Sequence, residues 1–208
     1  MTIKPYYETE LGKLYHGDCL EIMPQLEPVD LVLTDPPYGI NINKSNRLSI
    51  SRGFGDETWD ENPASDNQIK LCVEKSHNQI IWGGNYFNLP PTRHFIIWDK
   101  KNDGRDFADC EFAWTSFDKV ARIIRKRPMG MDGGKVHPTQ KPIELMIYCV
   151  DENSQSNNTV LDPFLGSGTT AIACERLKRK WIGIEISEKY CEISAKRIEA
   201  ERKQLKLF

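Results

Sequence analysis

The stretch that decides the fold is Val160-Leu-Asp-Pro-Phe-Leu-Gly-Ser-Gly-Thr-Thr170. Its apolar start is typical of a buried strand, its two glycines indicate a tight turn, and a helical spacing of apolar residues continues over Thr169–Leu177. A glycine-rich turn between a strand and a helix lets a ligand approach the backbone closely. A phosphate-binding P-loop would need a lysine directly after Gly168, where this chain has a threonine. We therefore expect a neutral to cationic ligand at this turn.

Strand and helix patterns alternate along the rest of the chain. Short runs rich in Ile, Val, Leu and aromatic residues predict strands at Lys13–His16, Val29–Thr34, Gln79–Trp82, His94–Trp98, Glu111–Thr115, Thr159–Leu161 and Trp181–Glu185. Helical spacing predicts helices at Cys19–Leu26, Pro63–Ser76, Ile143–Glu152, Thr169–Leu177 and Ser187–Lys203. This alternation predicts a single α/β domain over residues 1–208, with a mostly parallel sheet, helices on both faces and ligands at the carboxyl ends of the strands.

Two polar, glycine-containing stretches, Gly39–Asp60 and Pro128–Pro138, fit neither pattern. We expect both to be mobile surface loops, and long loops of this kind often carry function.

The composition restricts the other classes of protein. The six cysteines include no C-x-x-C pair and the four histidines are scattered, so we expect reduced thiols and no metal site. The chain has 28 Lys and Arg residues and 30 Asp and Glu residues, which gives a net charge of −2. Binding to a polyanion must therefore come from local clusters of positive charge. No apolar run is long enough to span a membrane and the N-terminus lacks the apolar core of a signal peptide, so we expect a cytoplasmic protein without a membrane partner.

The strongest chemical signal is Asp35-Pro-Pro-Tyr38, directly after the predicted strand Val29–Thr34. An exocyclic amine of a nucleobase is a poor nucleophile because its lone pair is delocalised into the ring, and acceptors for its N–H groups favour a geometry that frees the lone pair. The Asp35 carboxylate and the Pro36 carbonyl can be these acceptors, held in place by the two prolines. Tyr38 can stack on a base that is flipped out of its helix. A plain strand followed by a proline-fixed turn is the alternative interpretation.

Further polar residues follow the other predicted strands. Glu185 ends a strand 23 residues after Asp162, which is the spacing expected of an acceptor for ribose hydroxyls. Asp18 follows the first strand in the same way, although such a residue is more often a plain helix N-cap. Thr139 and Lys141 precede a predicted helix and, beside the glycine-rich turn, offer polar groups to the carboxylate end of a ligand. Taken alone, a proline-marked helix start is the preferred interpretation.

Together these segments resemble the amino-methylating DNA methyltransferases, the N4-cytosine/N6-adenine family. The match consists of D-P-P-Y at 35–38, H-P-T-Q-K-P at 137–142, D-P-F-L-G-S-G-T-T at 162–170 and G-I-E at 183–185, and it extends from about Lys13 to Lys196. The catalytic tetrapeptide precedes the cofactor loop, as in the circularly permuted order called beta class. The resemblance implies a Rossmann-like methyltransferase fold with a seven-stranded, mostly parallel sheet that includes one antiparallel strand.

The resemblance also implies S-adenosyl-L-methionine as the cofactor, with its methionine moiety near Phe164–Gly168, its ribose on Glu185 and its adenine on Asp18. The expected cofactor-binding residues are Asp18, Asp35, Thr139, Lys141, Asp162, Phe164, Gly166, Ser167, Gly168, Thr169, Thr170 and Glu185. The expected catalytic residues are Asp35, Pro36, Pro37 and Tyr38. The implied activity is site-specific methylation of the N6 amino group of adenine in double-stranded DNA, with base flipping.

Contacts to DNA phosphates are expected from two basic clusters, although a run of charges is more often a solvated face. The clusters consist of Lys119, Arg122, Arg125, Lys126 and Arg127, and of Lys44, Arg47 and Arg52. The chain has no sizeable insertion for target recognition. We expect recognition from the loop of about 39–60 and a segment of about 119–138, and hence a short target site or relaxed specificity.

Three alternatives remain open. The first is a cytosine-N4 methyltransferase, although within this family a serine in place of Asp35 is the commoner cytosine form. The second is a protein or RNA methyltransferase, but glutamine-methylating relatives use N-P-P-Y and place the cofactor loop before it. The third is a non-catalytic DNA-binding or regulatory subunit, against which the two intact motifs argue. A homodimer and a cognate restriction endonuclease are further partners that the motifs leave open.

Overall fold

The computed structural model describes residues 3–40, 61–102, 108–128 and 140–205. Within them, nine strands form one sheet in the order β1-β2-β9-β8-β3-β4-β6-β5-β7. The strands are β1 (Tyr7–Glu8), β2 (Gly12–His16), β3 (Val29–Thr34), β4 (Ser76–Trp82), β5 (Phe95–Asp99), β6 (Cys110–Thr115), β7 (Arg122–Arg125), β8 (Thr159–Asp162) and β9 (Lys180–Glu185). The helices are α1 (Cys19–Ile22), α4 (Asp66–Glu74), α5 (Ile143–Asn153), α6 (Thr169–Leu177) and α7 (Glu188–Leu205), with short 3-10 helices η1 (Met23–Gln25) and η2 (Gly84–Tyr86).

Parallel pairing organises the centre of the sheet. β2 pairs with β9, β9 with β8, β8 with β3 and β3 with β4, all in parallel. β6 is antiparallel to both β4 and β5, β7 is parallel to β5, and β1 is antiparallel to β2. The expected α/β fold with a mostly parallel sheet is therefore confirmed, and the carboxyl ends of five neighbouring strands meet at one edge.

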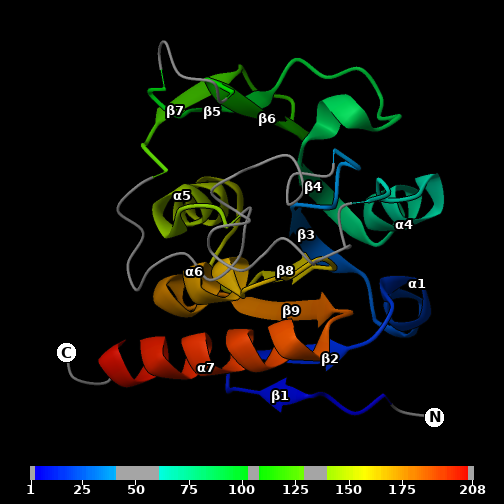
Figure 1. Cartoon of the computed structure of the whole chain (residues 1–208), viewed down its shortest axis with the longest axis vertical. Helices are drawn as coiled ribbons and strands as arrows, with labels where there is room; N and C mark the ends of the chain where they lie inside the picture. Colours follow the sequence, from blue (N-terminus) through cyan, green and yellow to red (C-terminus); the bar gives the residue numbers. More distant parts are fainter. Residues whose placement is uncertain (1–2, 41–60, 103–107, 129–139, 206–208) are drawn as a thin grey trace.

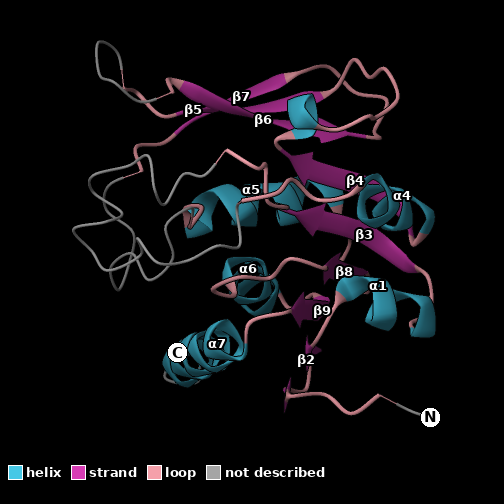
Figure 2. Ribbon diagram, turned by 45° about the vertical axis from the view of Figure 1, so that its right-hand side comes forward, coloured by secondary structure: helices cyan, strands magenta, loops and turns pink. Residues whose placement is uncertain are grey.

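Helices cover both faces of this sheet, as Figures 1 and 2 show. Alternation along β3 explains the two layers, because successive side chains of a strand point to opposite faces. Leu31 and Leu33 belong to the larger core cluster, which includes residues of α5, α6 and α7. Val32, between them, belongs to the second cluster with Cys19 of α1 and Cys72 of α4.

The expectation of seven strands was wrong by two. β1 has only two residues, which is too short to give a periodic pattern. β7 has the sequence Arg-Ile-Ile-Arg and falls in the stretch that the sequence marked only as a basic cluster. It lies at the edge of the sheet, where one side lacks a neighbouring strand within the described residues, and exposed charges are common on such strands.

Local chemistry sets the helix boundaries. The helix expected over Cys19–Leu26 divides at Pro24, so that α1 is followed by the 3-10 helix η1. α4 begins later than expected because Ser65 and Gln68 form a reciprocal capping box before the first turn.

All six cysteines are free thiols, and five of them are buried. Among the described residues, no helix combines the length and the apolar character needed to cross a membrane. Most of the loop expected at Gly39–Asp60, and the segment 129–139, lie outside the described residues.

Candidate active site

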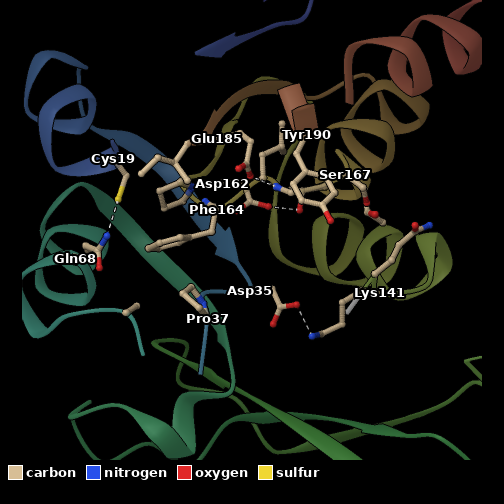
Figure 3. A pocket seen from close by; sticks show the side chains of 18 of the residues that line it. Cys19, Asp35, Pro37, Gln68, Lys141, Asp162, Phe164, Ser167, Glu185 and Tyr190 are labelled. Atoms are coloured by element: carbon tan, nitrogen blue, oxygen red, sulfur yellow. Dashed lines mark hydrogen bonds and ion pairs between the residues drawn. The ribbon is translucent and has the colours of Figure 1, made fainter. Parts of the chain in front are cut away.

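A cavity of about 360 Å³ lies at the carboxyl edge of the parallel strands. Ten of the residues expected to bind a cofactor line it, namely Asp18, Asp35, Lys141, Asp162, Phe164, Gly166, Ser167, Thr169, Thr170 and Glu185. Figure 3 labels six of them, Asp35, Lys141, Asp162, Phe164, Ser167 and Glu185, which come from segments far apart in the sequence. Gly168 is not among the lining residues and serves as the N-cap of α6, and Thr139 lies outside the described residues.

Asp162 joins β8 to β3 and α6 beneath the cavity. Its carboxylate accepts hydrogen bonds from Thr34 Oγ1 at 2.7 Å, Thr170 Oγ1 at 2.6 Å and the Phe164 amide at 3.1 Å. Burial raises the pKa of Asp162 to about 6, and these three hydrogen bonds only partly offset the loss of solvation. Asp162 therefore fixes the position of the glycine-rich turn as well as lining the cavity.

The glycine-rich turn is held from two sides. The Gly166 amide donates to Glu185 Oε2 at 2.8 Å, and the Gly166 carbonyl accepts from Ser194 Oγ of α7 at 2.6 Å. Gly168 has a φ of +83°, and a Cβ at this position would lie 3.1 Å from the Ser194 Cβ. The second glycine is thus required both by its backbone conformation and by the close approach of α7.

Glu185 and Asp18 supply carboxylates to the cavity wall. Glu185 Oε1 accepts from the Ser187 amide at 2.8 Å, and burial raises the pKa of Glu185. Because a carboxylate can accept about four hydrogen bonds, Glu185 keeps capacity for a ligand hydroxyl beside the amides of Gly166, Ser187 and Ile186. Asp18 accepts from the Leu20 amide at 2.8 Å and is the N-cap of α1, so this residue both caps a helix and faces the cavity.

Asp35 lies where β3 ends and is bound on both of its oxygens. Tyr38 donates its hydroxyl hydrogen to Oδ1, and the Lys141 ammonium lies 2.7 Å from Oδ2. Burial raises the pKa of Asp35, although the nearby Lys141 lowers it in part. Burial and the Asp35 carboxylate raise the pKa of Tyr38 well above its usual range, so the phenol stays protonated and acts as a donor.

Lys141 is 4% exposed and has a second carboxylate partner, Glu111 of β6, whose Oε2 lies 2.9 Å from its ammonium nitrogen. Burial lowers the pKa of Lys141, but the two carboxylates more than offset this and leave it raised. The ammonium therefore has partners other than the ligand carboxylate that the sequence led us to expect. Lys100 lies 2.5 Å from Glu111 Oε1. Burial alone would raise the pKa of Glu111, but Lys141 and Lys100 lower it to about 2.

Glu111 and Tyr86 are two residues beside the site that the sequence did not reveal, and the cavity-lining Gln68, Gln140 and Tyr190 are others. Glu111 had one signal, since it is a charged residue inside the apolar strand C-E-F-A-W-T. Tyr86 stacks on Tyr38 with ring centroids 4.9 Å apart and an interplanar angle of 12°. A Cβ at Gly83 would lie 2.1 Å from Tyr38 Cε1, so only glycine lets this turn pack against the ring.

Comparisons with known proteins find relatives among the DNA methyltransferases. Residues 97–196 match the family model described as DNA methylase. The chain is 26% identical to the Type II methyltransferase M2.MboI of Moraxella bovis, over 95% of this chain and 92% of the relative. It is 25% identical to the Type II methyltransferase M2.DpnII of Streptococcus pneumoniae, over 95% of this chain and 93% of the relative. These matches support the N4-cytosine/N6-adenine DNA methyltransferase family, which the sequence motifs led us to expect.

Solved structures confirm the methyltransferase fold. The chain matches the crystal structure of an M1.HpyAVI–SAM complex with a TM-score of 0.61 and 26% identity, over 90% of this chain and 98% of that chain. It also matches the PvuII DNA methyltransferase (cytosine-N4-specific) with a TM-score of 0.62. At 17% identity, this second likeness concerns the fold alone.

In this methyltransferase, the basic cluster of residues 119–127 lies on and beside the edge strand β7. Intramolecular partners hold three of its five cations, in the pairs Lys119–Asn153, Arg125–Asp99 and Lys126–Glu144. Arg122 and Arg127 are exposed and form no ion pair with another described residue. The second cluster, Lys44, Arg47 and Arg52, lies outside the described residues.

The raised pKa of Asp162 predicts a specific dependence of stability on pH. A carboxyl group whose pKa is higher in the folded state binds more protons there, so its contribution to the free energy of unfolding falls as the pH rises from about 4 to about 6. Between these pH values, we expect the free energy of unfolding to fall by roughly 2–3 kcal/mol less in the Asp162→Asn variant than in wild type. Urea denaturation at several pH values measures the difference. Asp151→Asn, at a surface carboxylate that is 57% exposed, is the control and should follow wild type. Parallel curves for wild type and Asp162→Asn would contradict the prediction.

Proposed function

We propose that this DNA methyltransferase uses S-adenosyl-L-methionine to methylate the N6 amino group of adenine in double-stranded DNA. The observation that carries the proposal is the Asp35 carboxylate, which lies at the wall of the cavity while Tyr38 and Lys141 fix its orientation. Prolines follow it at positions 36 and 37, so the backbone beside the carboxylate has little freedom.

The charges around the cavity suit the proposed cofactor. Four carboxylates line it, those of Asp18, Asp35, Asp162 and Glu185, and the single Lys or Arg among its lining residues is Lys141. Because Lys141 is already paired with carboxylates, the cavity favours a cationic sulfonium over a nucleotide phosphate. We assign the ribose hydroxyls to Glu185, whose oxygens retain acceptor capacity, and the adenine end to the side of Asp18.

When bound, S-adenosyl-L-methionine supplies an electrophilic methyl group on its sulfonium. Asp35 accepts an N–H hydrogen of the target amine, and we assign the second acceptor role to the Pro36 carbonyl, because the Pro37 carbonyl is bonded to the Ala64 amide at 2.9 Å. As the amine nitrogen gains a methyl group it becomes cationic and must release one proton. The Asp35 carboxylate, whose pKa is raised by burial, is the group suited to receive it.

Adenine is favoured over cytosine by the residue at position 35. An aspartate at this position is typical of the N6-adenine members of the family. In the cytosine-N4 members, serine is the commoner residue there. The target base must leave the duplex to reach Asp35. We assign the stacking of the flipped base to the aromatic side chains at this edge of the sheet, where Tyr38 and Tyr86 stack on each other.

Replacing the acceptor tests the reaction and the base together. We expect Asp35→Ala to lower methyl transfer by about a hundredfold to a thousandfold or more, since a positioned charged acceptor is lost. The assay incubates the protein with unmethylated DNA and labelled cofactor, and then identifies the methylated nucleoside. N6-methyladenine is the expected product, whereas N4-methylcytosine would establish the cytosine alternative. Asp118→Ala, at a carboxylate that is 86% exposed, is the control. Near-normal turnover by a folded Asp35→Ala protein would remove Asp35 from the reaction.

Calorimetry tests the cofactor site. We expect one site for S-adenosyl-L-methionine, weakened about tenfold or more in Glu185→Ala, because hydrogen bonds to a charged acceptor are lost. Glu185→Gln keeps one carbonyl acceptor and should have an intermediate affinity. Glu188→Ala alters a nearby acid that does not line the cavity and should bind like wild type. Unweakened binding by Glu185→Ala would exclude the ribose role.

The basic cluster makes a third prediction, for DNA binding. Replacing Arg122 and Arg127 with glutamine should flatten the plot of log affinity against log salt by about 0.9 for each lost phosphate contact, while cofactor affinity stays unchanged. Lys4→Gln with Lys13→Gln removes the same charge beside the opposite edge strand and is the control. If the arginine and lysine variants have the same slope, the cluster is only a solvated face.

A further inference from the structure

We propose that Glu111 is a positioning residue for methyl transfer, which holds the Lys141 ammonium between two carboxylates so that Asp35 remains a strong acceptor for the target amine. The inference rests on the proposed function and adds a residue that does not line the cavity. It concerns how the charge of Asp35 is controlled from outside the cofactor site.

The geometry forms a chain of alternating charges that leads from Asp35 to Lys100, directly after β5. Lys141 lies 2.7 Å from Asp35 and 2.9 Å from Glu111, and Glu111 in turn lies 2.5 Å from Lys100. The exposed fractions of the side chains are 19% for Asp35, 4% for Lys141, 25% for Glu111 and 13% for Lys100. Charges this poorly solvated interact strongly, so each one alters the proton affinity of the next.

Two carboxylates on one ammonium are more than charge neutrality requires. Asp35 alone would neutralise Lys141, and the pair would then hold Asp35 as a tightly bound, weakly accepting carboxylate. Glu111 takes a share of the same ammonium, which leaves more negative charge on Asp35. Lys100 compensates Glu111, so the four groups together are neutral and the burial of the extra carboxylate is tolerated.

Other groups near the cluster do not supply this control. Tyr38 and Cys149 are kept protonated by burial, which raises the pKa of the Cys149 thiol to about 12. Asp35 contributes to the raised pKa of Asp162 of β8, whose own carboxylate is bonded to Thr34 and Thr170. Among the described residues, Glu111 is therefore the carboxylate that competes with Asp35 for the Lys141 ammonium.

Two neutral substitutions should move Asp35 in opposite directions. Glu111→Gln removes a negative charge, so the pKa of Asp35 should fall by on the order of one unit. Lys100→Gln removes a positive charge and strengthens the effect of Glu111, so the pKa of Asp35 should rise. Carbon-13 NMR of labelled aspartate side chains measures the titration in the full chain, and the Asp35→Asn protein assigns the signal. Glu201→Gln removes a carboxylate that is 10% exposed and bonded to Arg176, and it should leave Asp35 unchanged.

Kinetics on DNA give the second readout. We expect Glu111→Gln to lower kcat by about ten- to a hundredfold with unchanged cofactor affinity, and to move the acid limb of the pH–rate profile to lower pH. Lys100→Gln should move that limb to higher pH. If Glu111 had only a structural role, the two variants would be less stable, but the acid limb of the pH–rate profile would not shift in opposite directions.

The outcomes separate the two proposals. An unchanged pKa of Asp35 in both variants overturns the role of Glu111, even where wild type methylates DNA. A wild-type protein that transfers no methyl group to DNA overturns the proposed function, while the NMR titration still decides the coupling. If Glu111→Gln fails to fold, Lys100→Gln decides, and a pKa of Asp35 that does not rise overturns the inference.

Discussion

Parallel hydrogen bonding among β2, β9, β8, β3 and β4 is the constraint on which the site depends. A parallel sheet aligns the carboxyl ends of its strands, so residues that follow different strands must meet at one edge. Asp18, Asp35, Asp162 and Glu185 each end or follow one of four neighbouring strands, and all four line one cavity. Strand pairing thus brings the four carboxylates together at one edge of the sheet.

Local patterns predicted much of this arrangement, and long-range contacts account for what they missed. The turn at residues 162–170 and the strand-end carboxylates were identifiable because each carries its signal within a few neighbours. β7 was not, because its two isoleucines lie between arginines on a sheet edge that only the folded chain creates. The partners of Lys141 were also hidden, since Asp35 is 106 residues away in sequence and Glu111 lies on a third segment.

The site combines two electrostatic demands. Its cavity wall is acidic, which suits a cationic donor, yet in the proposed reaction Asp35 must keep enough negative charge to bind an amine. Burial alone would neutralise that carboxylate by raising its pKa, and a single buried lysine would bind it too tightly. In the proposed arrangement, the Lys141 ammonium shared by Asp35 and Glu111 lies between these limits.

The contact between Ser194 and the Gly166 carbonyl determines when the site is completed during synthesis. The ribosome makes β3 and Asp35 early, but β8, which lies beside β3, comes more than a hundred residues later, as the separation of 128 between Thr34 and Asp162 shows. The turn that β8 carries is then held in place only when α7 has left the ribosome. Until β8 is made, the nascent chain leaves one edge of β3 without its neighbouring strand, and unpaired strand edges favour aggregation.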